Sequence, residues 1–226
     1  GSLCKTATAG SLPCPFGPHL LLWFESSGLH GKAGGTALSD PAAAAPAPPP
    51  GPLTLTVAPD SANDAIRRRL RAARAALGGR DRHDAARAVG RILARLPEVR
   101  RARTIAFYSA IRGEVDCGPA MAVAWRRGQQ VYLPVVRGRH LGFARHAPGW
   151  RLGGGRFGIP VPVSGRTTTR RARALDVVVA PVVAFDARGH RLGTGGGWYD
   201  RTLAFRRHRS HLRRPIFIGV AYAFQQ

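Results

Sequence analysis

Apolar and polar positions change their spacing several times after residue 60, which indicates alternating helices and strands. In the first such segment Ile66, Leu70, Ala73 and Leu77 recur at three- or four-residue intervals, as on one face of a helix. The helices that this spacing predicts, with Gly or Pro signals near several of their ends, cover about 61–77, 84–96, 118–127 and a stretch from about Tyr199.

Short runs rich in β-branched and aromatic residues lie between these helices. The strongest run, 176–185 (DVVVAPVVAF), is apolar at nearly every position, as in a central strand that is buried on both faces. Further strands are predicted over 104–109, 130–136 and 215–224, with 140–144 as a short edge strand. The alternation predicts an α/β fold with an open, mostly parallel sheet sandwiched by helices, a Rossmann-like three-layer architecture.

Residues 1–60 differ from the rest in composition, because they are rich in Gly, Ala, Pro and Ser and include the tract Pro41–Pro52. Such a tract buries too little apolar surface to order itself. We therefore predict a disordered low-complexity extension over 1–60 and one domain over 61–226. The run Leu20–Phe24 is too short for a signal-peptide core or a membrane span. The three cysteines form no CxxC pair, which favours a reducing, cytoplasmic setting.

The formal net charge of +23 belongs almost entirely to the predicted domain, in which every basic residue is arginine. Two explanations stay open. Arginine can simply fill solvated positions in a chain from a GC-rich genome, or the charge can attract polyanions such as nucleic acid, nucleotide phosphates or a polyglutamate tail. The arginine clusters contain no interleaved aromatic residues of the kind that stack on bases.

One segment combines several features of a ligand site. The run 185–201 (FDARGHRLGTGGGWYDR) leaves the strongest predicted strand and enters a predicted helix. Ligands of open α/β sheets bind at the carboxyl ends of strands, and closely spaced glycines let backbone N–H groups approach an anion. Arg191 and Arg201 can contact an anion through their guanidinium groups, and Asp200 offers an oxygen ligand suited to Mg²⁺. A flexible surface loop is the alternative for a glycine run.

This run closely resembles the signature of the 5-formyltetrahydrofolate cyclo-ligase family, also called methenyltetrahydrofolate synthetases. Other segments match in order: the arginine-rich first helix, Gly-Glu-Val-Asp at 113–116, the strand at 131–136 and Gly-Ile-Pro-Val-Pro at 158–162. The resemblance covers about residues 62–226. It implies a ligase that uses ATP and Mg²⁺ to convert 5-formyltetrahydrofolate, with or without a polyglutamate tail, to 5,10-methenyltetrahydrofolate, ADP and phosphate. We expect a monomer.

The resemblance also implies roles for individual residues. Arg191, Tyr199 and Asp200 are the implied catalytic residues, with Asp200 as the metal ligand. Folate would contact Tyr108, Ser109, Glu114, Phe157 and Trp198. ATP would contact two arginines of the first helix and the glycine-rich segment, namely Arg67, Arg71, Arg191, Leu192, Gly193, Thr194, Gly195, Gly196, Gly197, Trp198 and Tyr199.

Three features depart from the family pattern. Trp198 stands where Tyr or Phe is usual, and Val161 stands where Glu is common. The sequence given ends at Gln226, whereas family members continue, so we expect a C-terminally truncated domain. A catalytically impaired, arginine-rich nucleic-acid-binding protein on the same scaffold is therefore the alternative function, with weak non-specific binding and no membrane association.

Overall fold

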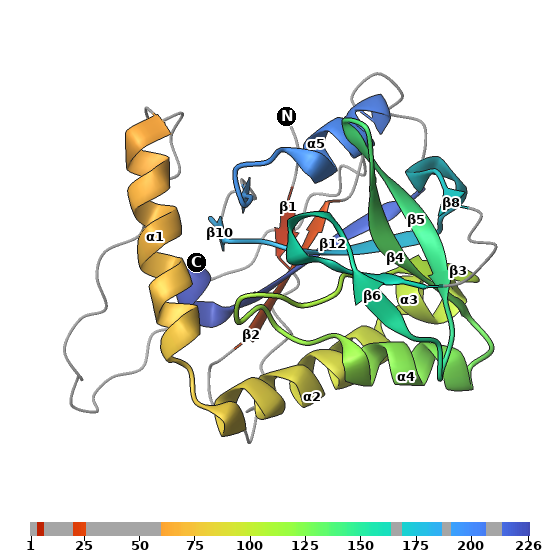
Figure 1. Cartoon of the computed structure of the whole chain (residues 1–226). Coiled ribbons are helices and arrows are strands. Elements are labelled where there is room, and N and C mark those ends of the chain that lie inside the picture. Colours follow the sequence, from red (N-terminus) through yellow and green to blue (C-terminus); the bar gives the residue numbers. More distant parts are fainter. Residues whose placement is uncertain (1–3, 7–19, 26–59, 164–168, 187–190, 207–213) are drawn as a thin grey trace, which may run out of the picture.

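The computed structural model describes residues 4–6, 20–25, 60–163, 169–186, 191–206 and 214–226 (Figure 1). Its helices are α1 (Asp60–Ala76), α2 (Gly79–Arg95), α3 (Pro97–Arg101), α4 (Gly118–Arg126) and α5 (Trp198–Leu203). Its strands are β1 (Cys4–Thr6), β2 (Leu20–Glu25), β3 (Thr104–Ala106), β4 (Gln130–Arg137), β5 (His140–His146), β6 (Leu152–Gly154), β7 (Pro160–Pro162), β8 (Thr169–Arg170), β9 (Val177–Pro181), β10 (Ala184–Phe185), β11 (Arg191–Leu192) and β12 (Ile216–Tyr222).

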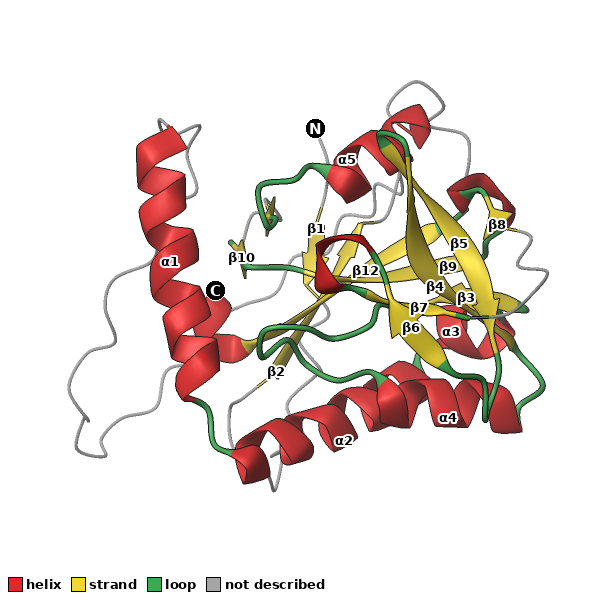
Figure 2. Ribbon diagram, viewed as in Figure 1, coloured by secondary structure: helices red, strands yellow, loops and turns green. Residues whose placement is uncertain are grey.

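The main sheet has the order β1-β2-β12-β9-β3-β4-β5-β8. The four strands β12, β9, β3 and β4 run parallel to one another. At the two borders, β2 pairs antiparallel with β12 and β1, and β5 pairs antiparallel with β4 and β8. Helices cover both faces, which confirms the predicted α/β class and the layered sandwich (Figure 2). The parallel character belongs to the centre of the sheet, and its borders are antiparallel.

Alternate residues of each central strand face opposite layers, as the two-residue period of a strand requires. Val177, Val179 and Ile105 pack with α2 and α4 on one face. Val178 and Phe217 pack with α5 and the residues that follow it on the other face. Both sides of these strands are fully buried, which explains why their sequences are continuously apolar.

The predicted strand 176–185 is wrong as a single element, because β9 ends at Pro181 and a separate strand, β10, begins at Ala184. The N–H of Val182 donates to the carbonyl of Val220, but the N–H of Val183 donates to the carbonyl of Leu192. The chain therefore leaves the main sheet at this point and pairs with β11. Apolar residues on both sides of the break hide it from sequence periodicity.

Other boundaries differ by a few residues. The helix predicted over 84–96, α2, begins at Gly79. The strand predicted over 104–109, β3, stops at Ala106. Pro97 ends α2 as predicted but also opens the short helix α3, since proline is tolerated in a first helical turn. The predicted edge strand at 140–144 extends to His146 and is covered by β8.

Within residues 1–60, for which we predict disorder, the structure describes the two strands β1 and β2. Strand β2 pairs antiparallel with β12 from Leu20 opposite Tyr222 to Glu25 opposite Phe217. A short apolar run is a suitable strand for the open edge of a sheet, whose backbone groups otherwise lack partners. Most of the extension, including Pro41–Pro52, lies outside the described residues.

In the described part of the chain, no helix combines the length and the apolar character that crossing a membrane requires.

Candidate functional site

A cavity of about 470 Å³ opens at the carboxyl edge of the parallel strands. The last residue of β9, Pro181, lines it together with Tyr108 and Ser109, which follow β3. The carboxyl ends of parallel strands share one edge of a sheet, so the loops after β3 and β9 converge there. Strand β4 adds Pro134 to the wall.

The cavity gathers most of the predicted site residues from four separate segments of the chain. Arg67, Leu192 and Gly195 do not line it, although all three lie in or beside the elements that do. The predicted residues that line it are Arg71, Tyr108, Ser109, Glu114, Phe157, Arg191, Gly193, Thr194, Gly196, Gly197, Trp198, Tyr199 and Asp200.

Residues 193–197, called the glycine loop below, lead from β11 into α5. Gly195 has a φ of 97° and Gly197 a φ of 57°, both in the left-handed region that favours glycine. A Cβ at Gly196 would lie 2.7 Å from the ring of Trp198, and one at Gly197 would lie 2.7 Å from the guanidinium of Arg201. The loop therefore requires glycine for both its conformation and its close packing.

Helix α1 holds the glycine loop through two arginines of one face. Arg67 Nε donates to the carbonyl of Gly193 at 3.0 Å, and Arg71 donates to the carbonyl of Thr194 at 2.9 Å. Between them Leu70 packs with Leu192 in a small buried cluster. The arginines predicted to contact ATP thus contact the loop backbone, and of the two only Arg71 reaches the cavity wall.

Arg201, which the sequence offers as an anion contact, donates to backbone carbonyls in the structure. Its guanidinium donates to the carbonyl of Gly196 at 2.7 Å and to that of Arg139 at 2.9 Å, which ties the glycine loop to the β4–β5 turn. It also lies over the ring of Trp198, 4.9 Å from the ring centroid, and it does not line the cavity. Its role is to support the loop, a distinction that the sequence cannot make.

Arg191 and Asp200 form an ion pair at 2.5 Å on the wall of the cavity. The side chain of Arg191 is 16% exposed and lies over the ring of Phe217, whereas that of Asp200 is 48% exposed. Among the described residues no three His, Cys, Asp or Glu side chains are grouped to hold a metal. Since Mg²⁺ commonly takes one or two carboxylates and completes its shell with phosphate and water oxygens, an accessible Asp200 fits the role of a single protein ligand.

Glu114 lies in the loop between β3 and α4 and faces the same cavity. Its carboxylate accepts the N–H of Ile111 at 3.2 Å. Burial raises the pKa of Glu114, and this hydrogen bond and the nearby Arg74 offset the rise only in part. A carboxylate that is costly to bury and is turned toward a cavity is suited to accept hydrogen bonds from a ligand.

Aromatic side chains form the remaining wall. Phe157 is 53% exposed and its ring lies 5.7 Å from that of Trp198, centroid to centroid. Tyr108 is buried and donates to the carbonyl of Val115 at 2.6 Å, and Ser109 donates to that of Pro160 at 3.0 Å. Burial also raises the pKa of Tyr199, so its hydroxyl stays protonated and is available only as a neutral group.

Residue-by-residue reasoning missed the contribution of the strands β4 and β5 and of two arginines. Val135 and Leu141 line the cavity because β4 lies next to β3 in the sheet and β5 lies next to β4. Arg112, whose φ of 50° is unusual for a residue other than glycine, and Arg156 line it too. In the sequence, the turn marked by Gly113 was the feature that could have pointed to Arg112 as a residue of the site.

Taken together, these features define an α/β protein with an open cavity and an arginine-supported glycine loop at the carboxyl edge of its sheet, where such folds bind ligands. The model of the 5-formyltetrahydrofolate cyclo-ligase family matches residues 59–226. The chain belongs to this family.

Individual relatives agree. A 5-formyltetrahydrofolate cyclo-ligase of Haemophilus influenzae is 35% identical over 164 residues, covering 71% of this chain and 86% of that protein. One from Escherichia coli is 40% identical over 110 residues, covering 47% and 60%. The solved structure of Aquifex aeolicus 5,10-methenyltetrahydrofolate synthetase superposes with a TM-score of 0.60 at 34% identity, covering 72% of this chain and 79% of that one.

Proposed function

We propose that this protein is a ligase that converts 5-formyltetrahydrofolate and ATP to 5,10-methenyltetrahydrofolate, ADP and phosphate. The observation that carries the proposal is the shared cavity, in which the glycine loop with Arg71 and Arg191 faces Glu114 and the aromatic wall. One ligand rich in phosphate and one flat, polar heterocycle can therefore meet in a single space.

The reaction that we infer has two steps. The formyl oxygen attacks the γ-phosphorus of ATP and ADP leaves, which converts a poor leaving group into a phosphate ester. The N10 nitrogen of the folate then attacks the activated formyl carbon, the ring closes, and inorganic phosphate departs with the oxygen. Such phosphoryl transfer depends mainly on positioning and on neutralisation of charge.

The residues on the loop side suit the phosphate chain. Gly193, Gly196 and Gly197 of the glycine loop line the cavity and have no Cβ that would keep an anion from their backbone N–H groups, and Arg71 and Arg191 supply positive charge. We assign Asp200 as the single protein ligand of Mg²⁺, which would neutralise phosphate charge when bound. In the absence of ligand, Arg191 balances the charge of Asp200.

The residues on the other side suit the folate. Glu114 can accept N–H groups from the pterin ring, and Trp198 with Phe157 offers aromatic faces against which a flat ring can stack. The hydroxyl groups of Tyr108 and Ser109 donate to backbone carbonyls of the protein, so these two residues contribute to the shape of this wall and do not donate to the folate. We propose a monomer that also accepts polyglutamylated folate.

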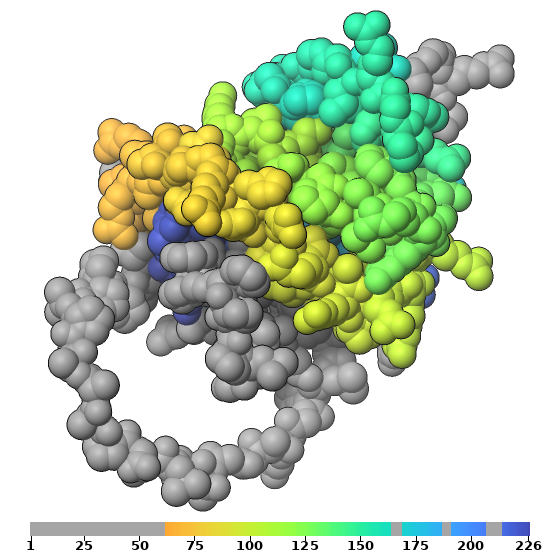
Figure 3. Space-filling model, turned by 90° about the horizontal axis from the view of Figure 1, so that it is seen from below, coloured from red at the N-terminus to blue at the C-terminus, as the bar shows by residue number. Residues whose placement is uncertain are grey.

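A weaker second activity is favoured by a different observation. Helices α2 and α4 form an outer face of the molecule (Figure 3), and a groove of about 550 Å³ between them is lined by five arginines and no acidic residue. The arginines are Arg87, Arg91, Arg95, Arg126 and Arg127. We expect weak, sequence-independent nucleic-acid binding that is largely lost by ~0.2 M salt, because it depends on phosphate contacts alone. Tight binding of one RNA at that salt would instead favour a nucleic-acid-binding protein.

The direct test of the ligase proposal is an assay of the full chain with 5-formyltetrahydrofolate, with and without ATP. We expect the absorbance of methenyltetrahydrofolate to appear only with ATP, together with one ADP per product. Product that forms equally well without ATP, or no product from a folded chain that binds ATP, would contradict the proposal.

A further inference from the structure

Gln225 is among the most deeply buried polar residues of the described structure, with 1% of its surface exposed. Its side-chain amide nitrogen donates to two backbone carbonyls, that of Val182 at 2.9 Å and that of Val183 at 2.6 Å. Its side-chain oxygen accepts the N–H of Tyr222 at 3.0 Å. Every hydrogen-bonding atom of the amide group thus has a backbone partner.

The two carbonyls belong to the point at which the chain leaves the main sheet. Val182 and Val183 connect β9 to β10, and the N–H of Val183 donates to the carbonyl of Leu192 at 2.9 Å. Leu192 is followed directly by Gly193, the first residue of the glycine loop. A short chain of contacts therefore leads from the Gln225 amide through Val183 to the beginning of this loop.

The loop is held from the opposite side by α1, through Arg67 and Arg71. Leu70 of this helix packs with Val183 and Leu192 in one buried cluster. The segment from Leu192 to Thr194 is therefore held by α1 on one side and, through Val183, by Gln225 on the other. The position of the glycine loop relative to the sheet depends on the contacts of both sides.

We propose that Gln225 is a positioning residue for the glycine loop, and through it for the phosphate chain of ATP. The proposal rests on the proposed function, because it takes the loop to be the nucleotide site. Gln225 does not line the cavity. Its effect is expected in the binding of ATP, since a loop that shifts by a fraction of an ångström presents its N–H groups at the wrong place.

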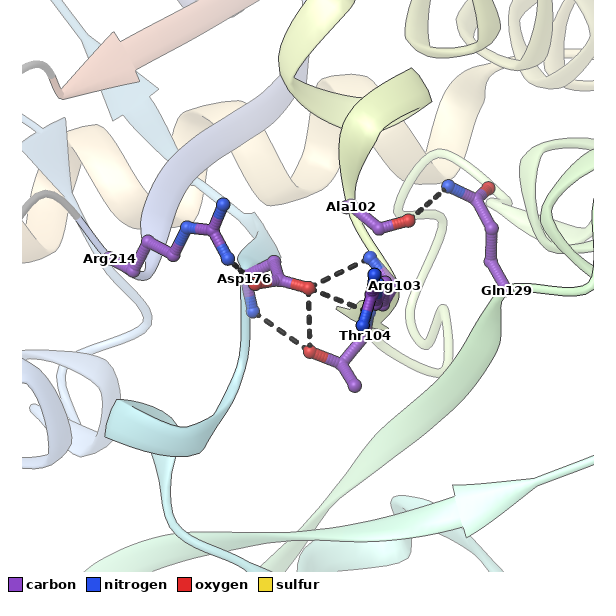
Figure 4. Close-up of polar contacts among 6 residues, drawn as sticks. All are labelled: Ala102, Arg103, Thr104, Gln129, Asp176 and Arg214. Carbon is purple, nitrogen blue, oxygen red and sulfur yellow. Dashed lines mark hydrogen bonds and ion pairs between the residues drawn. The ribbon is translucent and has the colours of Figure 1, made fainter.

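The molecule contains a matched control for this residue. Gln129 is also a buried glutamine, and its amide nitrogen donates to the carbonyl of Val99 at 2.7 Å. It also donates to the carbonyl of Ala102 at 2.6 Å (Figure 4). It lies at the amino edge of the sheet and does not line the cavity. Replacement of either glutamine by methionine, at similar volume, removes an amide donor from two backbone carbonyls. Gln225→Met also removes the acceptor of the Tyr222 N–H, whereas the side-chain oxygen of Gln129 has no hydrogen-bond partner among the described residues.

The experiment compares Gln225→Met with Gln129→Met in the full chain. We expect both variants to melt at a lower temperature than the wild type. Only Gln225→Met should raise the KM for ATP, by about fivefold or more, with the KM for 5-formyltetrahydrofolate unchanged within about twofold. Hydrogen exchange of the glycine-loop amides should likewise become faster in Gln225→Met alone.

Equal KM values for ATP and equal loop exchange in the two variants would overturn the proposal and leave Gln225 a purely structural residue. If Gln225→Met does not fold, Gln225→Asn is compared with Gln129→Asn by the same criteria. If the wild type shows no ligase turnover, the proposed function fails, and the difference in loop exchange between the two variants still decides the role of Gln225.

Discussion

The two edges of the central sheet use similar polar side chains in different ways. At the amino edge Asp176 accepts the backbone N–H groups of Arg103 and Thr104 at 2.8 and 3.0 Å and the Thr104 hydroxyl at 3.1 Å, and it pairs with Arg214 (Figure 4). At the carboxyl edge Glu114 accepts a single N–H, and Asp200 is half exposed on a cavity wall.

The two carboxylates differ in how many hydrogen-bond partners the protein itself provides for them. Asp176 joins the starts of β3, β9 and β12, because its own carbonyl also accepts the N–H of Ile216. Burial alone would raise the pKa of Asp176, but its backbone, Thr104 and Arg214 partners outweigh burial and lower it. The pKa of Glu114 is raised instead, because burial exceeds what its few partners return. The carboxylate of Asp176 is used to hold strands together, whereas that of Glu114 keeps hydrogen-bonding capacity that a ligand can use.

The largest effect is expected from Asp200→Asn, which keeps size and hydrogen bonding but removes the charge. We expect turnover to fall by ~100-fold or more, equivalent to roughly 3 kcal/mol of transition-state stabilisation, with a much smaller effect on folate binding. Steady-state kinetics at saturating folate measure this loss, and Asp84→Asn, an exposed aspartate of α2, serves as the control.

Near-full turnover of Asp200→Asn with unchanged Mg²⁺ dependence would contradict the metal assignment. Asp200 lies in the first turn of α5, where a carboxylate also interacts favourably with the helix N-terminus. A stability loss without a kinetic loss would indicate that this local role is its main one.

At the other edge, Asp176→Ala should act on stability and not on catalysis. Removal of the acceptor leaves the N–H groups of Arg103 and Thr104 without their carboxylate, so we expect the free energy of unfolding to fall by about 2–3 kcal/mol. Urea denaturation measures this fall. The KM values and the turnover per folded molecule should not change.

The pH dependence of Asp176 has a defined sign. Its pKa is lowered in the folded protein, so its contribution is fully present above the ordinary value of 3.8 and is lost as the pH falls through the lowered value. The stability difference between the wild type and Asp176→Ala should therefore shrink only in that acidic range. A difference that disappears near neutral pH would contradict this account.

A third comparison separates the two faces of α1. Arg71→Met removes the contact to Thr194 and a positive charge on the cavity wall, so the KM for ATP should rise by ~10-fold, or about 1.4 kcal/mol. Arg68→Met, at an exposed position of the same helix, is the matched control and should leave the KM within about twofold. Equal effects of both would mean that overall charge, and not the Arg71 contact, attracts ATP.

The smallest expected effect is that of Glu114→Gln, which should raise the KM for 5-formyltetrahydrofolate by ~5-fold, about 1 kcal/mol, with little change in kcat. Because the pKa of Glu114 is raised, its carboxylate becomes protonated at a higher pH than an ordinary glutamate does. Wild-type folate affinity should therefore weaken as the pH falls toward this raised pKa from above, and Glu114→Gln should lack this dependence. A parallel pH profile in the variant would assign the titration to another group.

The sequence determined the local elements and the chemistry of the glycine loop. Four central strands and three long helices follow from spacings of two and of three to four residues, because burial on one or two faces leaves a direct mark on neighbouring positions. Gly195 and Gly197 were marked as a ligand loop by their order after a strand and before a helix, and the structure places Gly193–Gly197 in or beside the cavity.

Only the tertiary structure decided which polar residues support the site and which face it. Arg67 turned out to hold the loop carbonyl of Gly193, 126 positions away in the sequence. Arg201 holds the loop carbonyl of Gly196 and also the carbonyl of Arg139 in the β4–β5 turn, 62 positions away. The pairing of β2 with β12 and the contact between Gln225 and Val183 likewise join distant segments. Periodicity reports the burial of a side chain along its own element, whereas these contacts depend on how elements pack, which no local pattern encodes.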